Sequence, residues 1–120
     1  DSVAKRTKAF DYQISRFEHQ FSGVLCLQNS DNEGESGKPF LYNCPWNVAV
    51  QEQLNRRKFH QYVAKEGIER VQVDLEPGDL YFFLSENIHE VPSVIGESPR
   101  VVLAIFFAMS LDDDEIYVWA

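Results

Sequence analysis

The chain has no long hydrophobic run and no excess of basic residues. The longest apolar stretch among its 120 residues is 101–109, well short of the roughly 18 residues that a membrane-spanning helix needs. The chain shows no basic segment followed by an apolar one, so no secretory signal is visible. Nucleic-acid-binding domains usually carry clustered basic residues, but here the net charge is −8. We therefore expect a cytoplasmic protein that binds neither membranes nor nucleic acid.

Cysteine and histidine are also scarce. Cys26 and Cys44 have no second Cys or His at zinc-finger spacing, and thiols stay reduced in the cytosol, so both are expected to be free and buried. The three histidines are His19, His60 and His89. They are too few for a metal cupin that gathers three His and one Glu, because His60 lies in a polar segment and is expected to face solvent.

What is present predicts one folded domain over residues 1–120. Apolar residues make up 44% and aromatic residues 13%, which excludes disorder. Short alternating or apolar runs with turns between them are typical of a β-sandwich or barrel. An acidic, glycine-containing loop at 29–38 suggests a hairpin, and the polar segment 48–65 suggests one short helix. The expected strands are 10–17, 23–28, 39–43, 71–75, 80–84, 89–94, 100–109 and 116–119.

Two residues near the end of the chain have the right chemistry for a shared ligand. His89 begins an expected strand, and Arg100 opens the next one after a turn that contains Gly96. If these strands pair, both side chains lie at the same end of the barrel. Neutral imidazole binds Fe(II), and a guanidinium matches a carboxylate with two parallel hydrogen bonds. The alternative is a surface Arg100 that pairs with Glu97 or Glu90.

Residues 75–107, LEPGDLYFFLSENIHEVPSVIGESPRVVLAIFF, resemble the second half of the Fe(II)/2-oxoglutarate oxygenase core. Shared features are the PGDL turn, an aromatic strand, a His, a valine-rich strand, a glycine turn, and an Arg that opens an apolar strand. Residues 12–46 are similar to the first half of that core. The tail DDDEIYVWA is similar to small bacterial members that hydroxylate or chlorinate free amino acids.

The resemblance implies an all-β core, a double-stranded β-helix of the jelly-roll or cupin type with one or two short flanking helices. It implies an oxygenase that uses Fe(II) and 2-oxoglutarate to oxidise an unactivated C–H bond of a small molecule, with an amino acid as the expected substrate. His89 would be the distal iron ligand, and Arg100 would bind the far carboxylate of 2-oxoglutarate. The interpretation depends on these two side chains meeting in one cavity from adjoining strands, and side chains on opposite walls would overturn it.

The chain departs from the family at the proximal iron motif. The family has His-x-Asp or His-x-Glu, or His-x-Gly/Ala in halogenases, whereas this chain has His19-Gln20-Phe21. Phe21 cannot bind iron, and its bulk would obstruct the position that a halide needs. Either His19 is the second metal ligand of a degenerate site, or the motif belongs to a loop missing between about Phe17 and Phe21. The short length likewise predicts part of a longer chain.

Two further assignments stay open. Trp46 and Trp119 are candidates to line an amino-acid substrate pocket. The alternative function is a non-catalytic, cupin-like binding module whose metal site has decayed. Formation of succinate from 2-oxoglutarate and O₂ would separate the two functions.

Overall fold

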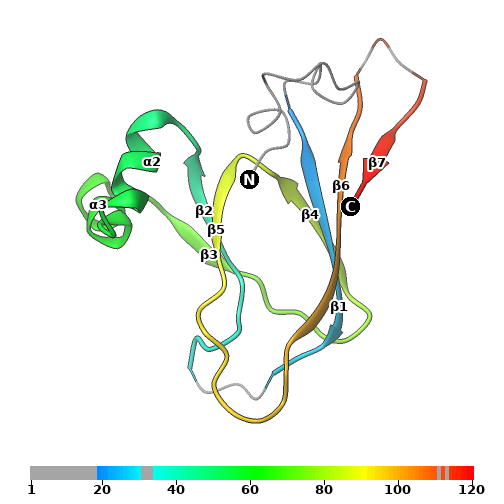
Figure 1. Cartoon of the computed structure of the whole chain (residues 1–120), viewed down its shortest axis with the longest axis horizontal. Helices are drawn as coiled ribbons and strands as arrows, with labels where there is room; N and C mark the ends of the chain where they lie inside the picture. The colour runs from blue at the N-terminus through cyan, green and yellow to red at the C-terminus, as the bar shows by residue number, and fades with distance from the viewer. Residues whose placement is uncertain (1–18, 31–33, 111, 113) are drawn as a thin grey trace.

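Two antiparallel sheets that face each other make up most of the chain (Figure 1). The computed structural model describes residues 19–30, 34–110, 112 and 114–120, so the expected strand 10–17 lies outside the described residues. One sheet has the order β4-β1-β6-β7 and the other the order β3-β2-β5. The strands are β1 (Phe21–Gln28), β2 (Phe40–Pro45), β3 (Arg70–Gln72), β4 (Leu80–Leu84), β5 (Asn87–Glu90), β6 (Val101–Ala108) and β7 (Tyr117–Trp119).

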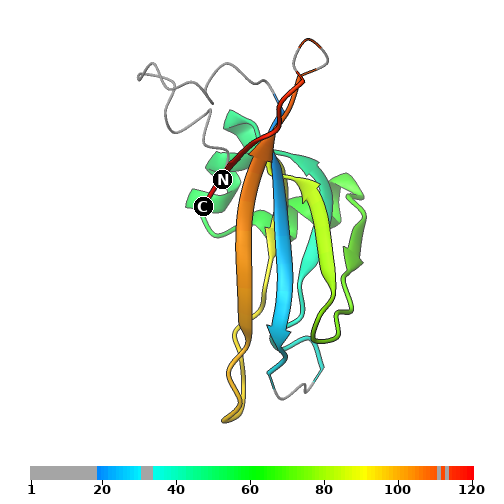
Figure 2. The same ribbon diagram turned by 90° about the vertical axis from the view of Figure 1, so that its right-hand side faces the viewer.

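The four-stranded sheet is built around β1, which pairs with β4 along one edge and with β6 along the other. Figure 2 shows these long strands running side by side. Side chains alternate across a strand, and Ser22, Val24 and Cys26 on β1 are all buried. They face the second sheet. Phe21 points the other way, where its ring stacks on Phe107 of β6 at a centroid distance of 5.2 Å.

The outer face of this sheet is apolar and open to solvent. Phe82 and Leu103 are each 56% exposed, and Leu80 is 52% exposed. Phe82 also packs edge-on against Phe107, with ring centroids 5.4 Å apart. Contiguous apolar patches of this kind are uncommon on the surface of a monomer.

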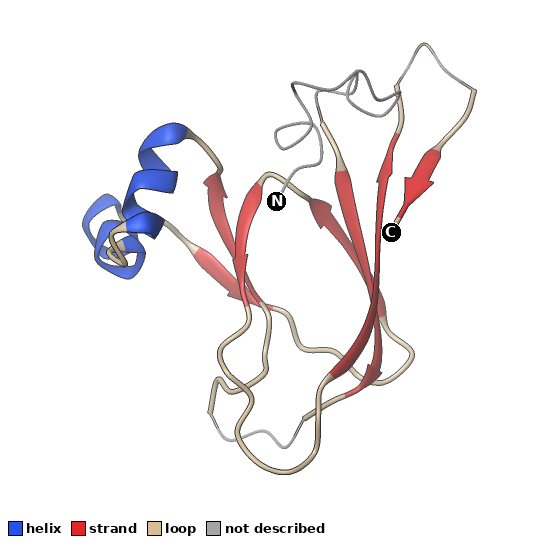
Figure 3. Cartoon of the chain, viewed as in Figure 1, coloured by secondary structure: helices blue, strands red, loops and turns tan. Residues whose placement is uncertain are grey.

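The second sheet carries the helices on its outer face (Figure 3). The expected single helix is instead two, α2 (Val48–Asn55) and α3 (Phe59–Glu66). They are separated where Arg57 adopts a left-handed φ of 57°, a conformation that does not continue a right-handed helix. Neither described helix has the length and apolar character needed to cross a membrane.

A compact core lies between this sheet and the helices. Tyr42 of β2 is 2% exposed, and its ring meets Phe59 of α3 edge-on at a centroid distance of 5.1 Å. Phe40, Cys44 and Val50 complete the buried cluster. Both Cys26 and Cys44 are buried and free, as predicted. This core fixes the position of β2, and therefore the positions of the strands paired with it.

The prediction of a hairpin at 29–38 is wrong, because β1 and β2 belong to different sheets. Both edges of β1 are already taken by β4 and β6, so the loop crosses from one sheet to the other. The other strands appear near their predicted positions, and β4 has the predicted bounds. Strands 71–75 and 89–94 are shorter than predicted, at Arg70–Gln72 and Asn87–Glu90.

Candidate active site

His89 lies on β5 and faces the space between the two sheets. Its pairing partner on β2 is Leu41. The neighbours of Leu41 on β2, Phe40 and Tyr42, pack toward the helices, so by alternation Leu41 and His89 point inward. The imidazole meets the ring of Phe83 on β4, with centroids 5.0 Å apart. His89 therefore reaches across from one sheet to the other.

The surroundings of His89 favour its neutral form. Burial among the walls of the interior lowers the pKa of the imidazole, and the hydrogen bond of Nδ1 to the Asn87 carbonyl, at 3.4 Å, partly offsets this effect. The side chain is nevertheless accessible to water, because the interior that it faces is open. A neutral, accessible imidazole is the form that binds a metal ion.

Arg100 lies directly before β6 and lines a cavity of about 410 Å³ between the sheets. Within the part of the chain that the structure describes, its guanidinium has no hydrogen bond or ion pair. The predicted alternative, a surface pair with Glu97 or Glu90, is wrong. Glu90 instead accepts a hydrogen bond from Tyr42 Oη at 3.0 Å and contacts His60 Nε2 at 2.9 Å. Arg100 is thus a free cation beside a cavity.

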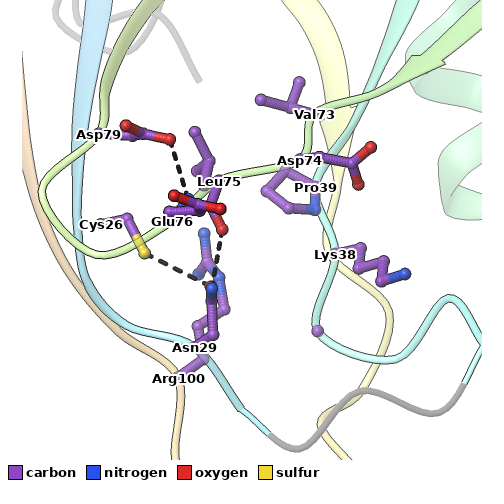
Figure 4. A pocket seen from close by; sticks show the side chains of 11 residues that line it. Cys26, Asn29, Lys38, Pro39, Val73, Asp74, Leu75, Glu76, Asp79 and Arg100 are labelled. Atoms are coloured by element: carbon purple, nitrogen blue, oxygen red, sulfur yellow. Dashed lines mark hydrogen bonds between the residues drawn. The ribbon is translucent and has the colours of Figure 1, made fainter.

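Hydrogen bonds within and between two segments, 26–29 and 75–79, shape this cavity (Figure 4). Asn29 Nδ2 donates to the Leu75 carbonyl at 2.7 Å, and Cys26 Sγ donates to Asn29 Oδ1 at 3.4 Å. The backbone N–H of Cys26 donates to the Asp79 carbonyl at 2.9 Å. These bonds tie the end of β1 to the segment that precedes β4, and Arg100 lines the same cavity.

The PGD turn has type II geometry. The backbone N–H of Asp79 donates to the Glu76 carbonyl at 2.9 Å, and Gly78 has a φ of 98°. Type II turns need a positive φ at the third position, which glycine adopts without strain. The turn brings the carboxylates of Glu76 and Asp79 to the cavity wall, together with Asp74.

The prediction that His89 and Arg100 come from adjoining strands is wrong. β5 belongs to the three-stranded sheet and β6 to the four-stranded sheet, so the two side chains lie on opposite walls. His89 is not among the residues that line the Arg100 cavity. By the criterion stated above, this pair no longer supports the oxygenase interpretation, which has to rest on other observations. The turn between β5 and β6 carries the chain from one sheet to the other.

Two aromatic rings bridge the space between these walls. Tyr81 and Phe83 alternate on β4 and face the interior, and their rings stack with centroids 5.5 Å apart. Phe83 contacts His89, and the charge of Arg100 acts on Tyr81. No motif in the sequence singles out Tyr81 or Phe83. The signal that separates Tyr81 and Phe83 from exposed Phe82 is the two-residue period of the strand.

His19 lies before β1, and its side chain is 58% exposed. Its Nδ1 is 2.9 Å from Glu86 Oε1. Among the described residues, no group of three or more His, Cys, Asp or Glu side chains is placed to hold a metal ion. We expected Phe21 to obstruct the position that a halide needs. It does not obstruct the interior, because its ring packs on the outer face against Phe107. The role of His19 as a metal ligand stays a prediction.

The two tryptophans lie in different surroundings. The indole N–H of Trp46, just after β2, donates to Gln51 Oε1 of α2 at 2.7 Å. Trp119 on β7 stacks on Phe106 with ring centroids 6.2 Å apart. Phe106 pairs with Ser22 on β1 and so faces the interior. Trp119 Nε1 is buried and has no hydrogen-bond partner among the described residues.

Solved structures with the same fold are known. The chain matches two crystal structures of an N-substituted L-amino acid dioxygenase from Burkholderia ambifaria AMMD, one of them in complex with alpha-KG. The TM-score is 0.64 for both, with 19% identity to the complex and 21% to the other structure. Each match covers 84% of this chain but only 38% and 39% of the solved chains. The predicted fold, a double-stranded β-helix with short flanking helices, is confirmed.

A comparison with curated proteins finds no match. A protein-family profile, described as carrier-protein-independent halogenase WelO5, matches residues 3–120. This match spans nearly the whole chain, and it confirms the predicted resemblance to the Fe(II)/2-oxoglutarate oxygenases. The chain belongs to the family of the carrier-protein-independent halogenase WelO5.

Proposed function

We propose that this chain contributes the cosubstrate-binding core of an Fe(II)- and 2-oxoglutarate-dependent enzyme. The enzyme oxidises an unactivated C–H bond of a small molecule, by hydroxylation or by halogenation. The observation that carries the proposal is the free guanidinium of Arg100 at a cavity between two β-sheets. Family membership supports the same proposal, as does the alpha-KG bound to a protein of the same fold.

Arg100 fits the far carboxylate of 2-oxoglutarate. An unpaired guanidinium binds a carboxylate through two charge-assisted hydrogen bonds. No described acid takes up its donors, although Glu76 and Asp79 line the same cavity. Their negative charge opposes a dianionic ligand, so Arg100 and a bound metal ion would have to offset this repulsion.

His89 fits one position of an iron site, because its imidazole is neutral and faces the interior. His19 is the candidate second ligand, and it would have to leave Glu86 to bind the same ion. Bound Fe(II) would supply the oxygen activation that protein side chains cannot. The chain's part is then to hold the 2-oxo acid by Arg100, to orient His89 against Phe83, and to keep apolar side chains around the reacting C–H bond.

The proposed substrate is a small molecule, with an amino acid as the first class to test. Trp119 Nε1 supports this choice, because its buried indole N–H finds no acceptor among the described residues and could donate to a ligand carboxylate or carbonyl. Trp46 is the weaker candidate, since Gln51 already accepts its indole N–H. The net charge of −8 disfavours nucleic acid as a partner and suits a cytoplasmic enzyme.

The decisive experiment measures succinate. The purified protein is incubated with Fe(II), O₂ and 2-oxoglutarate, with a panel of free and N-substituted amino acids, and with or without chloride. We expect succinate in the complete mixture. In the reactions that form succinate, we also expect an oxidised or chlorinated amino acid. Binding of 2-oxoglutarate without any succinate would instead favour the non-catalytic binding module, and absence of both would contradict the proposal.

A further inference from the structure

The strand that carries His89 is short and lies at the edge of its sheet. Within the described sheets, β5 pairs with β2 alone (Figure 1). Its register shifts between Leu41 and Pro45, and Pro45 has no N–H to donate to a neighbouring strand. A slip of one residue in such a strand turns every side chain to the opposite face. The pairing with β2 is thus a weak constraint on the orientation of His89.

Glu90 provides a second constraint, on the face of β5 opposite His89. Its pairing partner, Phe40, packs in the core beneath the helices, so the Glu90 side chain points toward α3. One carboxylate oxygen accepts a hydrogen bond from Tyr42 Oη at 3.0 Å. The other lies 2.9 Å from His60 Nε2 of α3. The carboxylate is therefore held between β2 and α3.

The hydrogen bond from Tyr42 is the stronger of these two contacts. Tyr42 is 2% exposed, and a buried hydroxyl that loses its acceptor is strongly disfavoured. Burial raises the pKa of Tyr42, and the hydrogen bond to Glu90 raises it further, so the hydroxyl is protonated at neutral pH and donates. The Tyr42 ring packs edge-on against Phe59 of α3 and is fixed there. A shift of β5 along its axis would therefore break the hydrogen bond.

We propose that Glu90 is a positioning residue that fixes the register of β5 and so turns His89 toward the interior. The two residues are adjacent and point to opposite faces, and the imidazole contacts Phe83 with ring centroids 5.0 Å apart. A slip of one residue would put the carboxylate in the interior and turn the imidazole toward α3. The inference rests on the proposed function in so far as His89 is a metal ligand, but its orientation is measurable without a metal.

The test follows the contact between the His89 and Phe83 rings by nuclear Overhauser cross-peaks, without added metal. We expect Glu90→Ala to lose most of the cross-peak intensity, because neither Tyr42 nor His60 then holds β5. Glu90→Gln keeps an oxygen that accepts from Tyr42 and should retain most of the intensity. Tyr42→Phe breaks the buried contact but keeps the ring in the core, and it should show a partial loss.

Two variants serve as controls. Glu52→Ala removes a carboxylate that pairs with Arg56 on the surface of α2. Asn47→Ala removes the cap of α2 and leaves the Glu90 contacts in place. Both should keep full cross-peaks. Because Asn47→Ala also loses stability, it separates a change in the orientation of His89 from general destabilisation.

Full cross-peaks in a folded Glu90→Ala variant would overturn the inference. If that variant does not fold, full cross-peaks in Tyr42→Phe do so, and an equal loss in Asn47→Ala would reduce Glu90 to a purely structural role. Titration with Fe(II) adds the functional consequence, and the affinity of Glu90→Ala should fall about tenfold, as for other residues that support a metal ligand. If the cross-peaks change as expected but wild type binds no Fe(II), the proposed function fails and the positioning role stands.

Discussion

Replacing Arg100 by alanine tests the proposed cosubstrate site most directly. A hydrogen bond to a charged group contributes about 1.5–3 kcal/mol, and a guanidinium makes two of them to a carboxylate. Arg100 is partly exposed, so solvent screening reduces the sum to about 2–4 kcal/mol. At about 1.4 kcal/mol per tenfold, the dissociation constant of 2-oxoglutarate should rise roughly 30- to 700-fold.

The assay is calorimetric titration with 2-oxoglutarate in the presence of Mn(II), which prevents turnover. Arg100→Lys keeps the charge but loses the planar pair of donors, so its affinity should fall between wild type and Arg100→Ala. Arg56→Ala is the matched control, because Arg56 pairs with Glu52 on the surface of α2. Metal affinity should be equal in all four proteins. A folded Arg100→Ala variant with unchanged 2-oxoglutarate affinity would refute the assignment.

Four further predictions concern the metal ligand and the local fold. His89→Ala should lose most of its Fe(II) affinity in a metal titration, and stoichiometric binding would rule the role out. Burial lowers the pKa of His89 in the folded state. Its contribution to the free energy of unfolding is therefore present above the ordinary pKa near 6.5 and declines as the pH falls below that value. Between pH 7 and 5.5, the free energy of unfolding measured with urea should fall more for wild type than for His89→Gln. Tyr42→Phe removes the hydrogen bond to Glu90 and should cost about 1–1.5 kcal/mol in chemical denaturation, and no loss would mean that Glu90 is fully compensated by His60. Asn47→Ala removes the cap that accepts from the Val50 N–H at 2.9 Å and should cost about 1 kcal/mol, against a few tenths for Asn47→Gly; equal losses would contradict the capping role.

The exposed outer face of the four-stranded sheet bears on how these experiments are run. Phe82, Leu80 and Leu103 present apolar surface there, and such surface promotes association. Binding and unfolding should therefore be measured at several protein concentrations, so that any self-association is separated from the effect of a substitution.

The sequence alone determined the local elements of this protein. Leu80–Leu84 was predicted with its observed bounds, because aromatic and aliphatic residues between two turns favour a strand. The type II turn at Glu76–Asp79 followed from Pro77 and Gly78, whose backbone preferences are intrinsic. The superfamily, and the double-stranded β-helix that goes with it, were implied by the resemblance of residues 75–107 to the oxygenase core.

Tertiary structure decided which strands became neighbours. The 95–99 turn reads like a hairpin, but β5 pairs with β2 and β6 pairs with β1, because pairing depends on distant segments that compete for the same strand edges. The same long-range pairing turned Tyr81 toward the interior and Phe82 outward. A sequence records which side chains alternate on a strand, but only the packed sheets decide which set faces the cavity.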